Sequence, residues 1–187
     1  MIGDRFDAVL ADAARGDEVA FGDLYRDVHP PLLRYLRAMS WENAEDASSE
    51  AWLEVARALP TFVGGEPAWR AWIFTIARRK LIDRIRYEAR RPSSGWDGSD
   101  DPGPLTRDIA EDVVEMDDTY RALALVQTLP ADQAEAVLLR IVAGLDYVDV
   151  AQVMSRTTGA VRVLVHRGLR RLATQLGDRS GTPGVTP

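Results

Sequence analysis

The spacing of apolar residues is the feature that most constrains how this chain can fold. Over much of its 187 residues they recur at the positions i, i+3, i+4 and i+7 of an α-helix, as in Phe21, Leu24, Tyr25 and Val28. No stretch alternates convincingly as a β-strand does. The helical period is lost between Arg91 and about Glu115, where Pro, Gly, Ser and Asp dominate. The sequence therefore predicts an all-α fold, with two small helical domains joined by an acidic, flexible linker.

The limits of these parts follow from breaks in the pattern. We expect an N-terminal domain at 1–91, the linker at 92–116, a C-terminal domain at 117–176 and a disordered tail at 177–187. In the first domain, Asp17 and Asn43 are expected to cap helices, and Pro60 to end the second of them. A Gly-rich loop at 60–67 then precedes a long helix at 68–90. In the second domain, helices are expected at 118–128, at 131–143 and in a tight pair from 146 onward.

Charge is strongly segregated along the chain. The 29 Asp and Glu outnumber the 23 Lys and Arg, and the net charge of -6 taken alone argues against a protein that coats nucleic acid. Yet residues 70–91, the first basic segment, hold 8 basic against 2 acidic residues, and residues 156–187, the second basic segment, hold 6 against 1. Between them, residues 92–135 hold 2 basic against 11 acidic residues. Such asymmetry indicates anion-binding surfaces.

The second basic segment and the residues before it follow the pattern of a helix-turn-helix, with a short helix after Asp146, a break at 155–157 and a longer helix. The expected buried positions are Val137, Leu138, Ile141, Val142 and Leu145, then Tyr147, Val150, Ala151 and Met154, and finally Val161, Leu164, Val165, Gly168 and Leu172. The opposite face of the last helix carries Arg162, Val163, His166, Arg167, Arg170 and Arg171. This face suits a DNA major groove, with Thr157 and Thr158 placed for phosphate contacts beside the helix N-terminus. The alternative is a solvated basic face.

The first basic segment combines arginines with large aromatics. In helix 68–90 one stripe carries Arg79, Asp83, Arg86 and Arg90, while Arg78, Lys80 and Arg84 project elsewhere. Trp52, Trp69 and Trp72 converge in sequence on the Gly-rich loop. Aromatic rings beside a cationic helix are suited to holding unstacked bases and their phosphates. The alternative is that the tryptophans are core residues of a helical bundle.

Several classes of protein are excluded. The chain has no cysteine, only two histidines and none of the common phosphate-loop, catalytic-triad or metal-ligand spacings, so we expect no enzyme, no cofactor and no metal. Residues 1–10 include the charged Asp4, Arg5 and Asp7, where a signal peptide would have an apolar stretch. No uncharged run approaches the roughly 18 residues of a membrane helix. A cytoplasmic protein without membrane insertion is expected.

These features together resemble the extracytoplasmic-function (ECF) sigma factors, small bacterial promoter-recognition subunits. Residues 43–91 are similar to the family's second conserved region, 129–172 to its fourth, and 20–40 to its opening helix. The resemblance implies a protein that binds the clamp and flap regions of core RNA polymerase, recognises -10 and -35 promoter DNA, and is held inactive by an anti-sigma factor.

The resemblance also implies roles for individual residues. For -10 DNA it implies Thr61, Phe62, Glu66, Trp69, Arg70, Trp72, Arg78, Arg79, Lys80, Asp83, Arg84 and Arg86. For -35 DNA it implies Thr157, Thr158, Arg162, Val163, His166, Arg167 and Arg170, and for core polymerase Asp46, Ser49 and Glu50. The chain departs from the family pattern at Ala47, Ser48 and Ser49, at Ser155 in place of the turn glycine, and at Val163 and Leu164 in place of a polar-basic pair.

A second function is open on the residues alone. A helix-turn-helix regulator could bind DNA without polymerase, with the N-terminal domain serving for dimerisation or sensing. That hypothesis leaves the Gly-rich loop and the basic helix after it unexplained.

Overall fold

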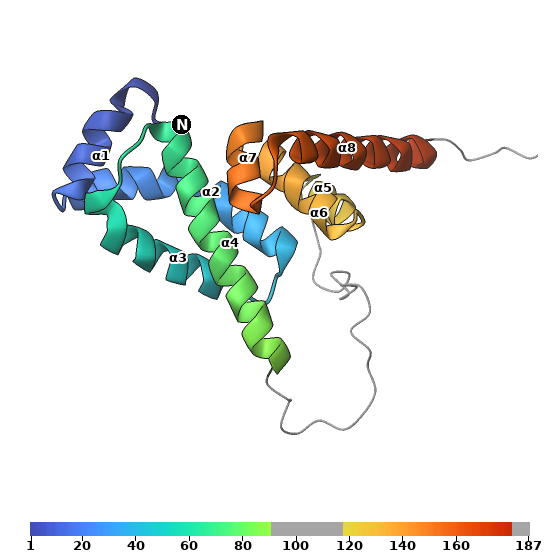
Figure 1. Cartoon of the computed structure of the whole chain (residues 1–187), viewed down its shortest axis with the longest axis horizontal. Helices are drawn as coiled ribbons and strands as arrows, with labels where there is room; N and C mark the ends of the chain where they lie inside the picture. The colour runs from blue at the N-terminus through green and yellow to red at the C-terminus, as the bar shows by residue number, and fades with distance from the viewer. Residues whose placement is uncertain (91–117, 181–187) are drawn as a thin grey trace, which may run out of the picture.

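The computed structural model of the chain describes residues 1–90 and 118–180, and all regular elements in these two ranges are helical (Figure 1). The first range contains η1 (Gly3–Arg5), α1 (Phe6–Ala14), α2 (Glu18–Met39), α3 (Ala44–Ala58), η2 (Leu59–Thr61) and α4 (Glu66–Arg90). The second contains α5 (Asp118–Gln127), α6 (Ala131–Val137), η3 (Leu138–Val142), α7 (Tyr147–Met154) and α8 (Thr158–Ser180). The predicted all-α fold is confirmed, and the predicted linker at 92–116 lies outside the described residues.

The start of α2 follows the predicted capping. The Asp17 carboxylate accepts hydrogen bonds from the backbone N–H groups of Val19 at 2.8 Å and Ala20 at 2.9 Å. Asn43 also occupies the N-cap position of α3, but its side chain makes no capping bond. Its amide instead donates to Glu88 at 2.9 Å, near the end of α4. The predicted boundary is correct, and the side chain joins two helices instead of capping one.

The long helices α2, α3 and α4 form the centre of the N-terminal part, with α1 packed on α2. Leu24, Val28 and Leu32 on α2 are completely buried, as are Val55 on α3 and Ile73 on α4. Burial of such side chains stabilises the fold by about 1.5–3 kcal/mol each. Ala56, the residue after Val55 on α3, is exposed.

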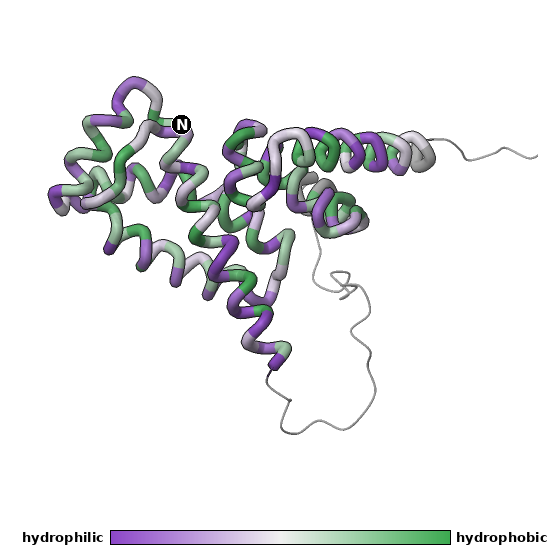
Figure 2. The backbone as a smooth tube through the Cα atoms, viewed as in Figure 1, coloured by the Kyte–Doolittle hydropathy of each residue, from purple (hydrophilic) through white to green (hydrophobic). Residues whose placement is uncertain are grey.

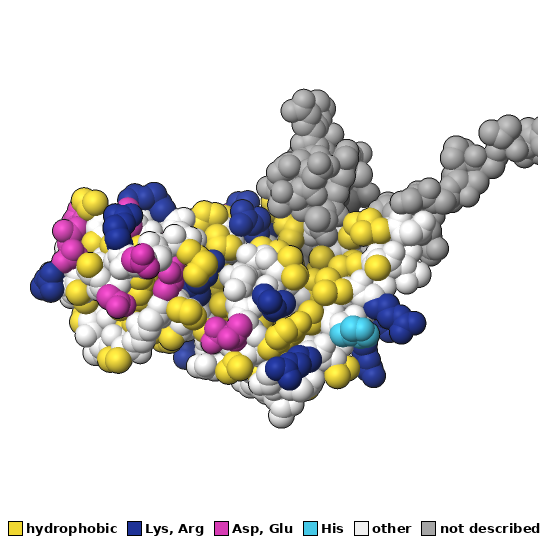
Figure 3. All heavy atoms as spheres, turned by 90° about the horizontal axis from the view of Figure 1, so that it is seen from above, with side chains coloured by type: hydrophobic (Ala, Val, Ile, Leu, Met, Phe, Trp, Pro, Cys, Tyr) yellow, Lys and Arg dark blue, Asp and Glu magenta, His cyan; other side chains and the backbone are white. Residues whose placement is uncertain are grey.

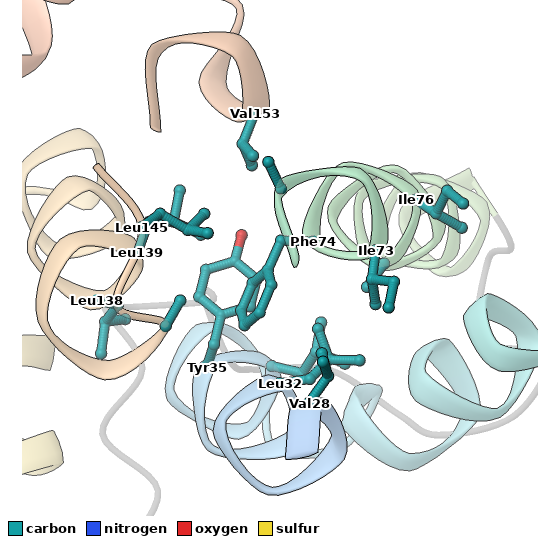
Figure 4. Packing of buried hydrophobic residues seen from close by; sticks show 14 of the residues in the cluster. Val28, Leu32, Tyr35, Ile73, Phe74, Ile76, Leu138, Leu139, Leu145 and Val153 are labelled. Carbon is teal, nitrogen blue, oxygen red and sulfur yellow. The ribbon is translucent and has the colours of Figure 1, made fainter. Parts of the chain in front are cut away.

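The two helical parts share one hydrophobic core instead of lying apart. Helix α7 packs against α4, while α5 and η3 pack against α2. Figure 4 shows Tyr35 and Phe74, from the first part, facing Leu139 and Leu145 from the second. All four side chains are at most 2% exposed. The structure is therefore a closed arrangement of the predicted domains.

A π-helical turn, η3, corrects the predicted burial before the helix-turn-helix. A regular period of 3.6 residues places Ile141 inside, but Ile141 is 60% exposed and Leu139 is completely buried. In η3 the Ala143 N–H donates to the Leu138 carbonyl five residues earlier, at 3.0 Å. The wider turn rotates the side chains that follow relative to a regular α-helix. The prediction for Ile141 was wrong for this reason.

The last helix is longer than predicted. Helix α8 continues to Ser180, so residues 177–180 of the expected tail are helical. Residues 181–187 lie outside the described part of the chain. In Figure 1 the C-terminal half of α8 projects away from the rest of the molecule.

The turn of the helix-turn-helix contains a strained serine. Ser155 follows α7 with φ 53° and ψ 47°, the left-handed conformation that glycine adopts without cost. We expect Ser155→Gly to raise the free energy of unfolding by roughly 0.5–1 kcal/mol, because relief of strain exceeds the entropy that glycine adds to the unfolded chain. Urea unfolding followed by circular dichroism measures this change. A destabilised variant would show that the serine is not strained here.

Candidate nucleic-acid and polymerase interfaces

The exposed face of α8 is the most complete candidate site. Arg162, Val163, His166, Arg167 and Arg170 are all exposed, while Val161 and Val165 are at most 2% exposed and fix the opposite face in the core. In Figure 3, Lys or Arg side chains gather around a histidine toward the end of the molecule where α8 lies. The structure thus presents these predicted residues together on one solvent-facing surface, as major-groove contact requires.

Tyr147 contacts a residue of this surface, and the sequence pattern did not predict that contact. The Tyr147 ring lies at the start of α7. The guanidinium carbon of Arg140 is 5.2 Å from the ring centroid, and that of Arg162 is 5.7 Å from it. The Arg140 guanidinium also donates to the Leu145 carbonyl at 3.2 Å. Cation-π contact restricts where Arg162 can point. Helical spacing alone assigned Tyr147 to the core, and it could not show that the half-buried ring is in contact with two guanidinium groups.

The two threonines at the start of α8 differ in exposure. Thr157 is exposed, and its hydroxyl accepts a hydrogen bond from the Ala160 N–H at 3.2 Å, so it caps the helix. Thr158 is half-buried. The cap orders the first turn of α8. It also occupies the Ala160 N–H, so fewer backbone N–H groups are free to bind phosphate there than the sequence indicated.

Most of the basic residues predicted to contact -10 DNA are paired with carboxylates. Arg79 and Lys80 both pair with Glu54 on α3, and hydrogen bonding to Arg79 lowers the Glu54 pKa. Arg70 pairs with Asp27 at 2.6 Å, and Arg78 with Glu135 at 2.6 Å. The positive charges of these four side chains are thus neutralised at close range. Arg86 and Asp83 are exposed on the hydrophilic C-terminal half of α4 (Figure 2).

Arg84, predicted to contact -10 DNA, pairs with two of the residues predicted to bind polymerase. Its guanidinium pairs with Asp46 and, at 2.9 Å, with Glu50, both on α3. Its Nε also donates to the Asn43 side chain at 3.3 Å. Arg84 thus orients the acidic face of α3.

The aromatic residues near the Gly-rich loop divide into core and surface. Trp69 is 1% exposed and Trp52 is 7% exposed, so both are core side chains in this structure, unlike the exposed positions expected for base contacts. Phe62 and Trp72 are half-buried, with ring centroids 5.0 Å apart. Of the predicted aromatic set, these two rings are the ones with accessible surface beside the loop.

Glu66 is placed differently from the prediction. Its carboxylate is buried and accepts the backbone N–H of Ile2 at 2.6 Å and of Gly3 at 3.0 Å. It therefore anchors the start of the chain to the start of α4 instead of facing solvent. In the same loop Thr61 is exposed, and its hydroxyl donates to the Ala58 carbonyl at 2.8 Å.

The exposed side of α3 carries the predicted polymerase contacts. Asp46 and Ser49 are exposed and Glu50 is partly exposed, whereas Ala47 and Ser48 point inward. Two apolar side chains add to the surface near α3, Trp41 at 59% and Leu53 at 57% exposure. Sequence reasoning missed both, although an exposed tryptophan is the kind of residue enriched at protein interfaces.

His29 lies under α3 in an aromatic group. Its ring stacks on Tyr25 at 4.4 Å between centroids, and its Nδ1 is 3.4 Å from the Ser48 hydroxyl. Burial lowers the His29 pKa, Glu45 opposes this effect and Arg37 adds to it.

This histidine predicts an acid-sensitive component of stability. Because the folded-state pKa is below the unfolded value of about 6.5, the unfolded chain takes up the proton first. The contribution of His29 is therefore complete above that value and is lost as pH falls through it toward the folded pKa. Urea unfolding at pH 5 and pH 8 should show a smaller acid loss for His29→Gln than for the unaltered chain. Equal losses in the two proteins would contradict the assignment.

In the ranges 1–90 and 118–180, no group of three or more His, Asp or Glu side chains is placed to hold a metal ion. None of the helices in those ranges has the length and apolar character needed to cross a bilayer.

The fold and the α8 surface define a class, that of all-α proteins with a DNA-binding helix-turn-helix. Family models described as Sigma-70 region 2 and Sigma-70, region 4 match residues 24–91 and 120–172. The ECF RNA polymerase sigma factor SigD of Mycobacterium tuberculosis is 34% identical, over 94% of this chain and 86% of its own length. BldN of Streptomyces coelicolor is 32% identical, over 93% and 67%. The chain belongs to the ECF family of RNA polymerase sigma factors, which direct RNA polymerase to promoters.

Solved structures with the same fold support the all-α architecture. CnrH, in complex with the cytosolic domain of CnrY, matches with a TM-score of 0.63 and 22% identity over 94% of this chain and 99% of its own. The sigma factor RpoE, in complex with the anti-sigma factor NepR from Bartonella quintana, matches with a TM-score of 0.64 and 23% identity over 84% and 96%.

Proposed function

We propose that this chain acts in the cytoplasm as a non-enzymatic subunit of RNA polymerase, with α8 contacting the -35 element and the loop before α4 contacting the -10 element. The observation that carries the proposal is the exposed face of α8, in which four cationic or titratable side chains surround Val163 within a helix-turn-helix. Arginines on such a face can contact guanine edges or phosphates of intact duplex.

The -10 contacts are assigned to a different kind of recognition. Promoter opening unstacks bases at a cost of a few kcal/mol, which an aromatic surface and cationic side chains can offset. Phe62 and Trp72 supply accessible ring surface beside the loop, and Arg86 supplies exposed positive charge on α4. We assign residues 1–91 to this function and to polymerase binding, and 117–176 to -35 binding.

The protein partners are assigned by surface. The acidic, partly apolar face of α3, with Asp46, Ser49 and Glu50, is proposed to bind the polymerase clamp, and the C-terminal helices to bind the flap. An anti-sigma factor is proposed as a further partner, because RpoE is bound by one in the structure with a similar fold.

Run-off transcription tests the proposal. Core polymerase should initiate at defined promoters only when this chain is added, and the chain alone should bind promoter duplex poorly. Tight specific binding by the isolated chain, with no effect on polymerase, would instead favour the polymerase-independent regulator.

The -10 assignment predicts a defect in opening. Arg86→Ala, and to a smaller extent Arg79→Ala, should reduce open-complex formation more than upstream duplex binding, because both remove charge near the unpaired strand. Arg79 is expected to matter less, since it is already paired with Glu54. Permanganate reactivity of unpaired thymines, compared with footprinting of the -35 region, separates the two steps. Undiminished opening in both variants would contradict the -10 assignment.

A further inference from the structure

A buried polar cluster joins the two helical parts. Glu135 on α6 is 6% exposed, and its carboxylate accepts hydrogen bonds from the Arg78 guanidinium on α4, Nε at 2.6 Å and Nη2 at 3.2 Å. The Tyr35 hydroxyl on α2 donates to the same carboxylate at 3.0 Å. Tyr35 itself is completely buried. All three polar groups therefore depend on the second part lying against the first.

Apolar and backbone contacts surround this cluster. Phe74 and Tyr35 face Leu139 and Leu145 across the boundary, as Figure 4 shows. Arg70 forms a second polar link, with Nη1 on Asp27 at 2.6 Å and Nη2 on the Ala143 carbonyl at 3.3 Å. Two of the arginines assigned to -10 DNA are thus used to hold the parts together.

We propose that Tyr35, Arg78 and Glu135 form a polar latch that specifies how the two parts of the closed free chain fit together, and that separation of the parts releases Arg70 and Arg78 for DNA. The release step rests on the proposed function, whereas closure does not. A buried ion pair gains little net free energy, because its attraction is offset by the loss of hydration. Separation of the two parts restores that hydration to all three groups. The latch therefore permits opening by a partner while it specifies how the parts fit.

The energetics of a buried ion pair distinguish a latch from simple packing. Removing the Glu135 charge leaves the partly buried Arg78 guanidinium without its partner, which favours the open state, where water can reach it fully. Replacing all the polar groups by apolar ones of similar size removes that penalty and leaves the closed state intact. Single substitutions are therefore expected to favour the open state, whereas the triple substitution is expected to leave the closed state unchanged.

The absence of cysteine from the chain allows a direct measurement of opening. Ala56 on α3 and Ala173 on α8 are both exposed, so Ala56→Cys and Ala173→Cys provide two specific labelling sites. Pulsed electron paramagnetic resonance gives the distribution of distances between nitroxide labels at these two sites in the full chain. We expect Glu135→Gln to raise the ratio of open to closed molecules by about tenfold or more. Tyr35→Phe, which removes one hydrogen bond, should shift the ratio less and in the same direction.

Two matched controls accompany this measurement. Asp23→Asn removes a carboxylate from α2, the helix that carries Tyr35, but Asp23 pairs with Arg26 within the first part, so closure should not change. The combination Tyr35→Phe, Arg78→Met and Glu135→Leu should stay as closed as the unaltered chain.

The outcomes are decisive for the latch. A distance distribution that stays unchanged in both Glu135→Gln and Tyr35→Phe would overturn it, as would opening of the triple variant. If Glu135→Gln loses helical content by circular dichroism, Tyr35→Phe alone decides. Failure of the unaltered chain to support transcription would overturn the proposed function and leave these distances unaffected.

Discussion

Replacing Gly168 with alanine is expected to lower the free energy of unfolding by about 1–3 kcal/mol, although alanine is the better helix former. Gly168 is buried where α8 crosses α6. A Cβ atom there would lie 2.7 Å from Cγ2 of Val137 and 3.4 Å from the backbone carbonyl of Gln133. Val137 is itself buried and its branched side chain has few alternative rotamers, so the helices must separate.

Two comparisons isolate this close approach. Gly159→Ala on the same helix meets no atom within 4 Å, so it should stabilise the protein by roughly 0.5–1 kcal/mol through helix propensity alone. The double variant Val137→Ala, Gly168→Ala should be less destabilised than the sum of the single changes. Val137→Ala removes the Cγ2 atom that the new Cβ at position 168 would otherwise meet. Urea unfolding of these four variants and of the unaltered chain measures these energies. A Gly168→Ala protein as stable as the unaltered chain would show that the two helices are not held this closely.

Local signals predicted much of the fold. Asp17 was predicted to cap α2 and a short helix was predicted to follow Asp146, and the side chains of both residues accept two backbone N–H groups. Gly168 was assigned to the buried face of the last helix by its spacing from Val161 and Val165, and it is buried there. Such features depend on residues a few positions apart, which a sequence displays directly.

Features that depend on distant pairs could not be predicted in this way. Arg78 and Glu135 are 57 positions apart, and nothing in either local pattern indicates that one neutralises the other. The same applies to Glu66, which accepts N–H groups more than 60 positions away. A count of charges shows that a basic segment exists, but the pairing of each charge is decided by tertiary packing.

The two candidate DNA surfaces show the difference clearly. On α8 the predicted residues alternate with small apolar residues that pack inward, so their exposure followed from the period of the helix. Near α4 the tryptophans are large enough to fill a bundle core, and the sequence could not decide between core and base contact. The structure assigns Trp52 and Trp69 to the core and leaves Phe62 and Trp72 partly exposed.

Replacing Arg162 with alanine should weaken binding of the polymerase complex at the -35 element by about 1–3 kcal/mol, or five- to 150-fold, if its guanidinium contacts a base. Arg162 lies about one turn after the start of α8 and is exposed. Its guanidinium carbon is 5.7 Å from the centroid of the Tyr147 ring, which restrains it. Because the contact is directional, discrimination at one base pair should also relax. Arg170→Ala is expected to weaken binding less, and uniformly across sequences, if Arg170 contacts phosphate.

The control for Arg162→Ala must remove the same charge without touching the α8 surface. Arg26→Ala on α2 meets this condition, since Arg26 pairs with the exposed Asp23 three residues earlier. Tyr147→Leu keeps every charge and removes the ring that restrains Arg162, so it should weaken -35 binding in the same direction by a smaller factor. Transcription from promoters with single -35 substitutions, at fixed salt, measures all three variants. Equal losses for Arg26→Ala and Arg162→Ala would show that α8 attracts DNA only through net charge, because a specific contact depends on position and a general attraction does not.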